Sequence, residues 1–189
     1  MLYTRKGDKG TTQFFGATER FSKASILPEA LGTLDELNSY IGYCKAKVRE
    51  GGYTLTVGKR KKSLAEILHR VQECLFTIQA ELAGAEKSIN KTKVTELEKS
   101  TDSIERVLPP IHTFSIPGGT VLSAEFDIAR TLARRAERRV VGVSEQTSEQ
   151  RKVGGYTLAY LNRLSSLLFA LARYVNHVEQ VHEESPTYS

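Results

Sequence analysis

The chain has 189 residues, of which 40% are hydrophobic and 26% are charged, and its formal net charge is +5. This composition is typical of one globular domain and excludes a disordered chain, and no apolar run approaches the ~18 residues that span a membrane. The positive charge favours a polyanionic partner, which could be nucleic acid, lipid or nucleotide.

The first element is a polar loop at residues 1–23. Between Thr4 and Thr12, the sequence TRKGDKGTT holds three cations, two glycines, three hydroxyls and one acid. The spacing does not fit a Walker A motif. Glycines nevertheless allow backbone N–H groups to approach phosphate oxygens, and lysine adds charge. The segment is either a frayed basic terminus or a loop that wraps an anion.

Hydrophobic periodicity predicts five helices after this loop, with no convincing strand pair and no internal repeat. The first has Pro28 in its opening turn and ends at Gly51-Gly52, and the second has Ser63 as N-cap. The others span about 93–108, 121–143 and 156–181. The stretch GGYTLTVGKRKK between the first two helices is a basic loop or a short hairpin. The predicted fold is therefore all-α, a single-domain five-helix bundle over residues 24–182 with a flexible tail at 183–189.

The fourth helix contains RTLARRAERR, with five arginines between Arg130 and Arg139. Its core face is predicted to hold Leu122, Phe126, Ala129, Leu132, Ala133, Ala136 and Val140. A different stripe stacks Arg130, Arg134 and Arg138 at intervals of four. Like charges at this spacing cost about 0.2–0.5 kcal/mol per pair, so acids or a bound anion must offset them. The stripe is either a solvated face trimmed by ion pairs or an anion site.

The fifth helix carries Asn162 on a stripe away from its leucine face, together with Ser166, Phe169 and Arg173. An asparagine in this position is either an exposed polar residue or a hydrogen-bonding group for a ribose or phosphate.

A protein-bound metal centre is not expected. Two Glu-x-x-His pairs exist, Glu66…His69 and Glu179…His182, and such pairs hold di-iron centres in some bundles. The first pair points away from the apolar face, and the second lies at the end of the last helix. His112 and His177 have no serine or cysteine partner at a recognisable spacing. Any chemistry would therefore need a reactive cofactor.

Cys44 and Cys74 lie within apolar helical patterns and are expected to be buried free thiols of a reducing compartment. The N-terminus also lacks an apolar signal segment. Both features predict a cytoplasmic protein, with a protein that has lost an organellar leader as the alternative.

Five blocks in order resemble the PduO-type ATP:cob(I)alamin adenosyltransferases: YTRKGDKGTT, LGTLDELNSYIG, FSIPGG, RTLARRAERR and YLNRLSSLLFALARY. The resemblance covers nearly the whole chain. It implies a homotrimer of five-helix bundles with active sites between subunits. The reaction would move the 5′-deoxyadenosyl group of ATP to the cobalt of cob(I)alamin, giving adenosylcobalamin and triphosphate. ATP and cobalamin would be substrates, with Mg²⁺ accompanying ATP.

The resemblance also implies roles for particular residues. The loop that wraps the triphosphate corresponds to Thr4, Arg5, Lys6, Gly7 and Thr12, with Lys23 as a further ATP contact. The RRAER block and the NRL asparagine supply the remaining nucleotide contacts, Arg134, Arg135, Glu137, Arg138 and Asn162. Asp35 and Arg130 correspond to an interface salt bridge that shapes the corrin pocket. Phe114 corresponds to the aromatic residue that crowds the lower corrin face and displaces the axial ligand.

Partners implied by the resemblance are a cobalamin reductase and an enzyme that uses adenosylcobalamin, with no nucleic acid and no membrane. The alternative, from charge alone, is a basic helical module that binds nucleotide or nucleic acid without chemistry.

Overall fold

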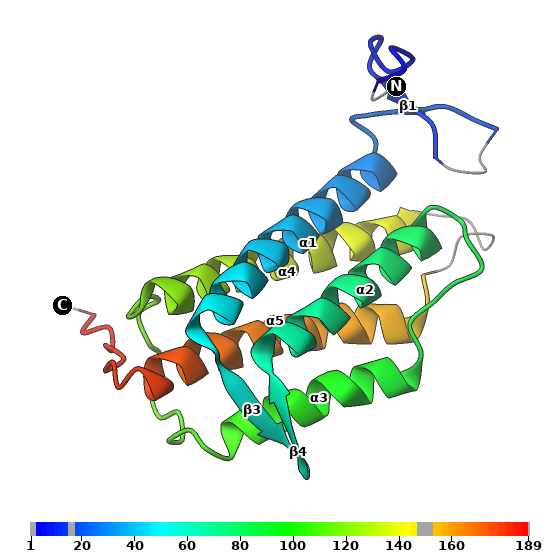
Figure 1. The fold of residues 1–189 in the computed structure, drawn as a ribbon. Helices are drawn as coiled ribbons and strands as arrows, with labels where there is room; N and C mark the ends of the chain where they lie inside the picture. The colour runs from blue at the N-terminus through cyan, green and yellow to red at the C-terminus, as the bar shows by residue number, and fades with distance from the viewer. Residues whose placement is uncertain (1–2, 15–17, 147–152, 189) are drawn as a thin grey trace.

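The computed structural model describes residues 3–14, 18–146 and 153–188 and is dominated by helices (Figure 1). These are α1 (Ile26–Gly51), α2 (Leu64–Leu82), α3 (Lys91–Glu105), α4 (Val121–Gln146) and α5 (Gly155–Val178). Helix α4 packs against both α1 and α5, α2 packs on α1, and α3 packs on α5. The predicted five helices are confirmed, with α3 and α5 each ending three residues earlier than expected.

The ends of the helices follow local sequence signals. Ser63 and Glu66 form a capping box at α2: the Ser63 hydroxyl accepts the Glu66 N–H at 3.1 Å, and the Glu66 carboxylate accepts the Ser63 N–H at 2.9 Å. Helix α1 ends where Gly52 adopts φ 66°, a left-handed conformation suited to glycine. The caps place the loops at the two ends of the bundle.

The core lies where the predicted apolar faces meet. On α5 the leucine face is fully buried, comprising Leu161, Leu164, Leu168, Leu171 and Val175. On α4 six of the seven predicted core residues are buried, and Leu132 is half-buried. Each fully buried leucine contributes about 1.5–3 kcal/mol relative to an exposed one. This core holds α4 and its charged stripe in a fixed orientation.

The prediction that the chain has no convincing strand pair is wrong. Strands β3 (Thr54–Val57) and β4 (Arg60–Ser63) form an antiparallel hairpin, and β1 (Thr11–Thr12) pairs with β2 (Phe21–Ser22). Of the two alternatives for the basic stretch, the hairpin is confirmed. A two-residue turn with Gly58 at φ 62° closes it. The sequence does not predict β4 as a strand because it is a basic run, and charged residues are poor strand formers.

The C-terminal residues differ from the expected flexible tail. The Ile116 N–H donates to the Glu184 carbonyl at 2.7 Å, so residues after α5 return to the loop that precedes α4. Residue 189 lies outside the described residues. Within the part of the chain that is described, no helix is long and apolar enough to span a membrane.

Candidate functional site

The N-terminal loop projects beyond the start of α1 (Figure 1). Two successive turns shape it, in which Asp8 N–H donates to the Arg5 carbonyl at 3.3 Å and Gly10 N–H to the Gly7 carbonyl at 3.1 Å. Gly10 adopts φ 75°, which only glycine takes without strain. The loop is therefore folded on itself rather than frayed, while its cations Arg5 and Lys6 stay exposed.

Arg20 holds this loop closed, and sequence reasoning missed it. Its guanidinium donates to the Thr11 hydroxyl at 2.9 Å, to the Thr11 carbonyl at 3.0 Å and to the Lys6 carbonyl at 2.6 Å. One arginine thus satisfies three acceptors on two sides of the loop. A lone arginine outside any motif gives no sequence signal for this contact.

Lys23 lies over the same loop. Its backbone N–H donates to the Gly10 carbonyl at 2.9 Å. A Cβ added at Gly7 would lie 3.1 Å from the Lys23 Nζ, so glycine leaves the space that the ammonium occupies. Lys23 is therefore brought against Gly7, one of the predicted loop residues.

Asp35 joins Thr12 and Lys23 around one open hollow of about 650 Å³, whose other walls are mostly apolar and include the exposed Phe76. Asp35 itself is exposed on α1. Arg130 is not its partner within this chain, because the Arg130 guanidinium pairs with Asp127 at 3.2 Å.

The arginines of α4 are only partly neutralised. Arg135 pairs with Glu36, and Arg139 pairs with Glu29 at 3.4 Å, both across to α1. Arg134 and Arg138 are exposed and form no ion pair within the described residues; Arg138 donates only to the Arg134 carbonyl, at 3.1 Å. Two guanidinium groups are left with donors for an outside anion.

Glu137 and Asn162 meet between α4 and α5. The Asn162 amide donates to the Glu137 carboxylate at 3.0 Å, while Arg163 donates to the Asn162 oxygen at 2.7 Å. Both predicted residues thus belong to one hydrogen-bonded network beside the arginine stripe.

The arginines of α4 lie on the part of the helix that packs beside the start of α1, close to the N-terminal loop. Helices α1 and α4 run antiparallel, because Glu29 pairs with Arg139 and the later Glu36 pairs with the earlier Arg135. The C-terminal half of α4 therefore lies beside the first turns of α1, from which the loop projects.

The loop that precedes α4 lies at the opposite end of the bundle (Figure 1), and Phe114 belongs to this loop. Its side chain is 79% exposed, which is unusual for a phenylalanine. The loop and the end of α5 enclose a hollow of about 260 Å³, lined by Phe114, Arg173 and three histidines among others. These histidines, His112, His177 and His182, were not assigned a role from the sequence.

The two Glu-x-x-His pairs are engaged elsewhere. Glu66 caps α2, His69 lies 3.6 Å from Glu73, and Glu179 accepts a hydrogen bond from Tyr53 at 2.5 Å. Among the described residues, no group of three His, Cys, Asp or Glu side chains could hold a metal ion.

The fold and these elements define a helical bundle with a basic loop and two exposed arginines that no acid of the described residues neutralises, a class of arrangement suited to phosphate groups. The family model described as cobalamin adenosyltransferase matches residues 2–175. A corrinoid adenosyltransferase from Citrobacter freundii is 36% identical and covers 91% of this chain and 93% of its own length. One from Bacillus subtilis is 37% identical, covering 93% of this chain and 86% of the relative.

Solved structures agree with this match. A variant of the PduO-type ATP:corrinoid adenosyltransferase from Lactobacillus reuteri, complexed with cobalamin and ATP, superposes with a TM-score of 0.84 at 30% identity, covering 99% of this chain and 97% of that one. The chain belongs to the cobalamin adenosyltransferase family and is a transferase of that family.

Proposed function

We propose that this chain transfers the 5′-deoxyadenosyl group of ATP to the cobalt of cob(I)alamin, at sites completed between the subunits of a homotrimer. The observation that carries the proposal is the pair of exposed guanidinium groups on α4, Arg134 and Arg138, that no acid of the described chain neutralises. Like charges four residues apart cost about 0.2–0.5 kcal/mol per pair, and a triphosphate that binds both guanidinium groups would offset that cost.

The proposed site needs no nucleophile from the protein. The electron pair of Co(I) forms the Co–C bond at C5′ of ATP, and the pair of the broken C5′–O bond leaves with triphosphate. The residues then have two tasks, to orient C5′ toward cobalt and to stabilise charge that grows on the departing oxygen. Lys23, the N-terminal loop and the Arg134 and Arg138 guanidinium groups suit the second task.

Mg²⁺ is part of the proposal as the ion that accompanies ATP. It binds proteins through one or two carboxylates plus substrate phosphates rather than in an all-protein cage. When bound, Mg²⁺ would neutralise part of the phosphate charge.

Phe114 is proposed to crowd the lower face of the corrin. An exposed aromatic ring presents no donor atom to cobalt and excludes water and the lower ligand. A four-coordinate Co(II) is easier to reduce, so the ring would tune a bound substrate without reacting. Its exposure in the single chain supports a role in contact with a large apolar ligand.

Assembly of more than one copy is supported by the distance between the two proposed binding elements. The N-terminal loop and the loop that precedes α4 lie at opposite ends of the antiparallel pair α1 and α4 (Figure 1). A 26-residue helix is about 39 Å long. Because C5′ must reach cobalt, one chain supplies one substrate's contacts and a second copy supplies the other's.

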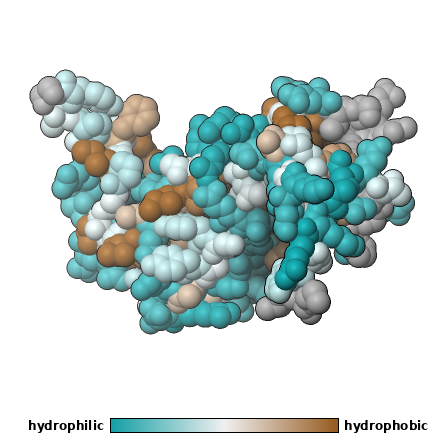
Figure 2. Space-filling model, turned by 90° about the horizontal axis from the view of Figure 1, so that it is seen from above, coloured by the Kyte–Doolittle hydropathy of each residue, from teal (hydrophilic) through white to brown (hydrophobic). Residues whose placement is uncertain are grey.

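Exposed apolar side chains also favour assembly. Phe76 is 62% exposed, Val121 75% and Ile128 48%. Figure 2 shows hydrophobic patches separated by hydrophilic residues on one face of the molecule. Burial between subunits would remove such patches from water.

A cytoplasmic location is proposed from Cys44 and Cys74, which are buried free thiols. Unpaired cysteines suit a reducing compartment.

The test is direct. Reduced cobalamin and Mg-ATP are mixed with the protein, and the light-sensitive Co–C product is followed by absorbance while triphosphate is quantified. We expect one triphosphate for each adenosylcobalamin. The alternative, a nucleic-acid-binding module, predicts salt-sensitive binding to DNA or RNA and no corrinoid product.

A further inference from the structure

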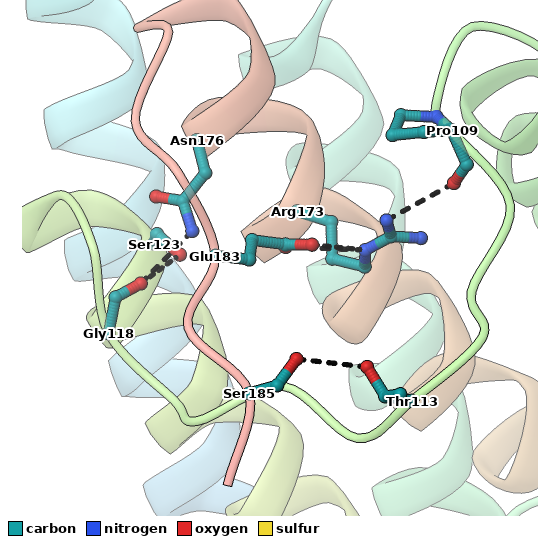
Figure 3. Close-up of polar contacts among 8 residues, drawn as sticks. All are labelled: Pro109, Thr113, Gly118, Ser123, Arg173, Asn176, Glu183 and Ser185. Atoms are coloured by element: carbon teal, nitrogen blue, oxygen red, sulfur yellow. Dashed lines mark hydrogen bonds and ion pairs between the residues drawn. The ribbon is translucent and has the colours of Figure 1, made fainter. Parts of the chain in front are cut away.

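The chain reverses direction directly after α5. Gln180 adopts φ 57°, its N–H donates to the His177 carbonyl at 3.2 Å, and Val181 N–H donates to the Asn176 carbonyl at 2.9 Å. This is the hydrogen-bond pattern of a Schellman turn with a non-glycine residue in the left-handed position. The turn sends residues 181–188, here called the strap, back along the loop of residues 109–119, here called the Phe114 loop (Figure 3).

The strap contacts the middle of the Phe114 loop on both sides of the aromatic residue. Ile116 N–H donates to the Glu184 carbonyl at 2.7 Å, and the hydroxyls of Thr113 and Ser185 lie 2.9 Å apart. Phe114 itself is 79% exposed, so packing of its ring does not fix its position. The backbone on either side must do so.

Arg173 joins the strap, the Phe114 loop and α5. Its Nε donates to both Glu183 carboxylate oxygens, at 2.9 and 3.2 Å, and its terminal nitrogen donates to the Pro109 carbonyl at 3.2 Å (Figure 3). The side chains of Arg173 and Glu183 are only 11% and 25% exposed. Such a shielded, charge-assisted contact is stronger than a surface ion pair.

The far end of the Phe114 loop is fixed without the strap. The buried Asn176 donates to the Gly118 carbonyl at 3.0 Å and accepts from Thr120 N–H at 3.0 Å, and the Ser123 hydroxyl also donates to Gly118, at 2.9 Å. Loosening the strap should therefore free the segment around Phe114 while the Gly118–Gly119 turn keeps its place.

We propose that Arg173 and Glu183 are positioning residues that lock the strap onto the Phe114 loop and thereby set where Phe114 stands against the corrin. The inference rests on the proposed function, in which Phe114 crowds the lower face of the corrin. It gives the C-terminal residues a part in the reaction at cobalt, although they contact neither the N-terminal loop nor the arginines of α4.

Glu183→Gln is the main test because it keeps the side-chain shape and removes the charge. Glu184→Gln is the matched control: it removes the same charge one residue later, where the backbone and not the side chain contacts Ile116. Hydrogen exchange of the corrinoid-free protein is measured first. Peptides covering 111–117 should exchange faster in Glu183→Gln and remain unchanged in Glu184→Gln, while peptides from α4 remain protected in both.

The second measurement is functional. In Glu183→Gln, turnover starting from cob(II)alamin should fall about tenfold with the KM for ATP within twofold, because only the geometry at cobalt is disturbed. The four-coordinate fraction of bound cob(II)alamin, read by electron paramagnetic resonance, should fall in parallel. Ser185→Ala removes a neutral contact and should shift the same readouts in the same direction by less.

If hydrogen exchange at 111–117 does not change in Glu183→Gln, or changes equally in Glu184→Gln, the Arg173–Glu183 pair does not hold the strap on the Phe114 loop. Faster exchange with normal turnover and a normal four-coordinate fraction would overturn its role in positioning Phe114. A parent protein that forms no adenosylcobalamin would instead refute the proposed function, and the exchange data would still report whether the strap holds the loop.

Discussion

The Asn162 amide donates a 3.0 Å hydrogen bond to the Glu137 carboxylate, which among the described residues forms no ion pair with Arg134 or Arg138. Glu137 follows Arg134 by three residues and precedes Arg138 by one. Side chains three apart on a helix are neighbours, so a released Glu137 would pair with Arg134. The amide thus preserves a positive surface in a place where the helix could neutralise itself.

Asn162→Ala should therefore raise the KM for ATP by about tenfold, the cost of about 1.4 kcal/mol in a charge-assisted contact. Steady-state kinetics with saturating reduced cobalamin measure this. Ser166→Ala, one turn further on the exposed stripe of α5, is the control and should leave the KM unchanged. An unaltered KM in Asn162→Ala would contradict the guarding role of the amide.

Arg134→Ala should keep the fold and strongly reduce ATP-dependent adenosylation. A charge-assisted hydrogen bond contributes about 1.5–3 kcal/mol, which predicts a loss in kcat/KM of roughly 10- to 150-fold. Arg139→Ala is the control, because Arg139 lies on the same helix but is exposed and paired with Glu29. This substitution should lower the free energy of unfolding by less than about 1 kcal/mol and change the activity little. Full activity in Arg134→Ala would count against the triphosphate assignment.

Phe114→Ala should impair the reaction from cob(II)alamin far more than ATP binding. Because the ring is 79% exposed, its removal should leave the melting temperature nearly unchanged. ATP affinity is measured by calorimetry and four-coordinate cob(II)alamin by electron paramagnetic resonance. Ile111→Ala, a second exposed apolar residue beside the same hollow, should retain the four-coordinate signal. Equal losses of ATP binding and of cobalt chemistry in Phe114→Ala would show that Phe114 does not act by crowding the lower corrin face.

Gly119→Ala should destabilise the turn that ends the Phe114 loop. Gly119 adopts φ 97°, and an added Cβ would lie 2.5 Å from the Asn176 oxygen, so strain and a clash coincide. Backbone strain of this kind costs of order 1–3 kcal/mol. Gly155→Ala is the opposite case, since it lies in α5 with open space around its Cβ position, and should be neutral or stabilising by about 0.5–1 kcal/mol. Denaturant unfolding compares both variants with the parent, and similar stabilities would contradict the argument.

The helical framework could be predicted because it depends on short-range periodicity. The leucine face of α5 and the apolar face of α4 were readable from residue spacing, and Ser63 and Gly52 marked helix ends through local chemistry. The sequence does not distinguish the hairpin from a loop, because the basic β4 strand has no alternating apolar pattern.

The polar contacts that hold the site could not be predicted in the same way. Arg20 and the Arg173–Glu183 pair act on loops whose positions depend on tertiary structure. Glu81 is a further example: from the end of α2 its carboxylate accepts the Gly154 N–H at 2.8 Å and the Thr157 hydroxyl at 2.5 Å, and so caps α5 across 73 residues. No spacing rule links an acid on one helix to the first turn of another.

The thiol of Cys44 should be almost inert in the native protein. Burial, and secondly the charge of Glu125, raise its pKa from 9.0 to about 12, and its side chain is fully buried. Three pH units correspond to a roughly thousandfold smaller thiolate fraction, and the thiolate is the reactive species. Because the folded-state pKa is raised, the stabilising contribution is complete below pH 9 and is lost as the pH rises from 9 toward 12. Iodoacetamide at pH 8.5 followed by mass spectrometry should modify Cys44 only after denaturant is added. Rapid native labelling would show that the α1–α4 contact opens far more often than this packing allows.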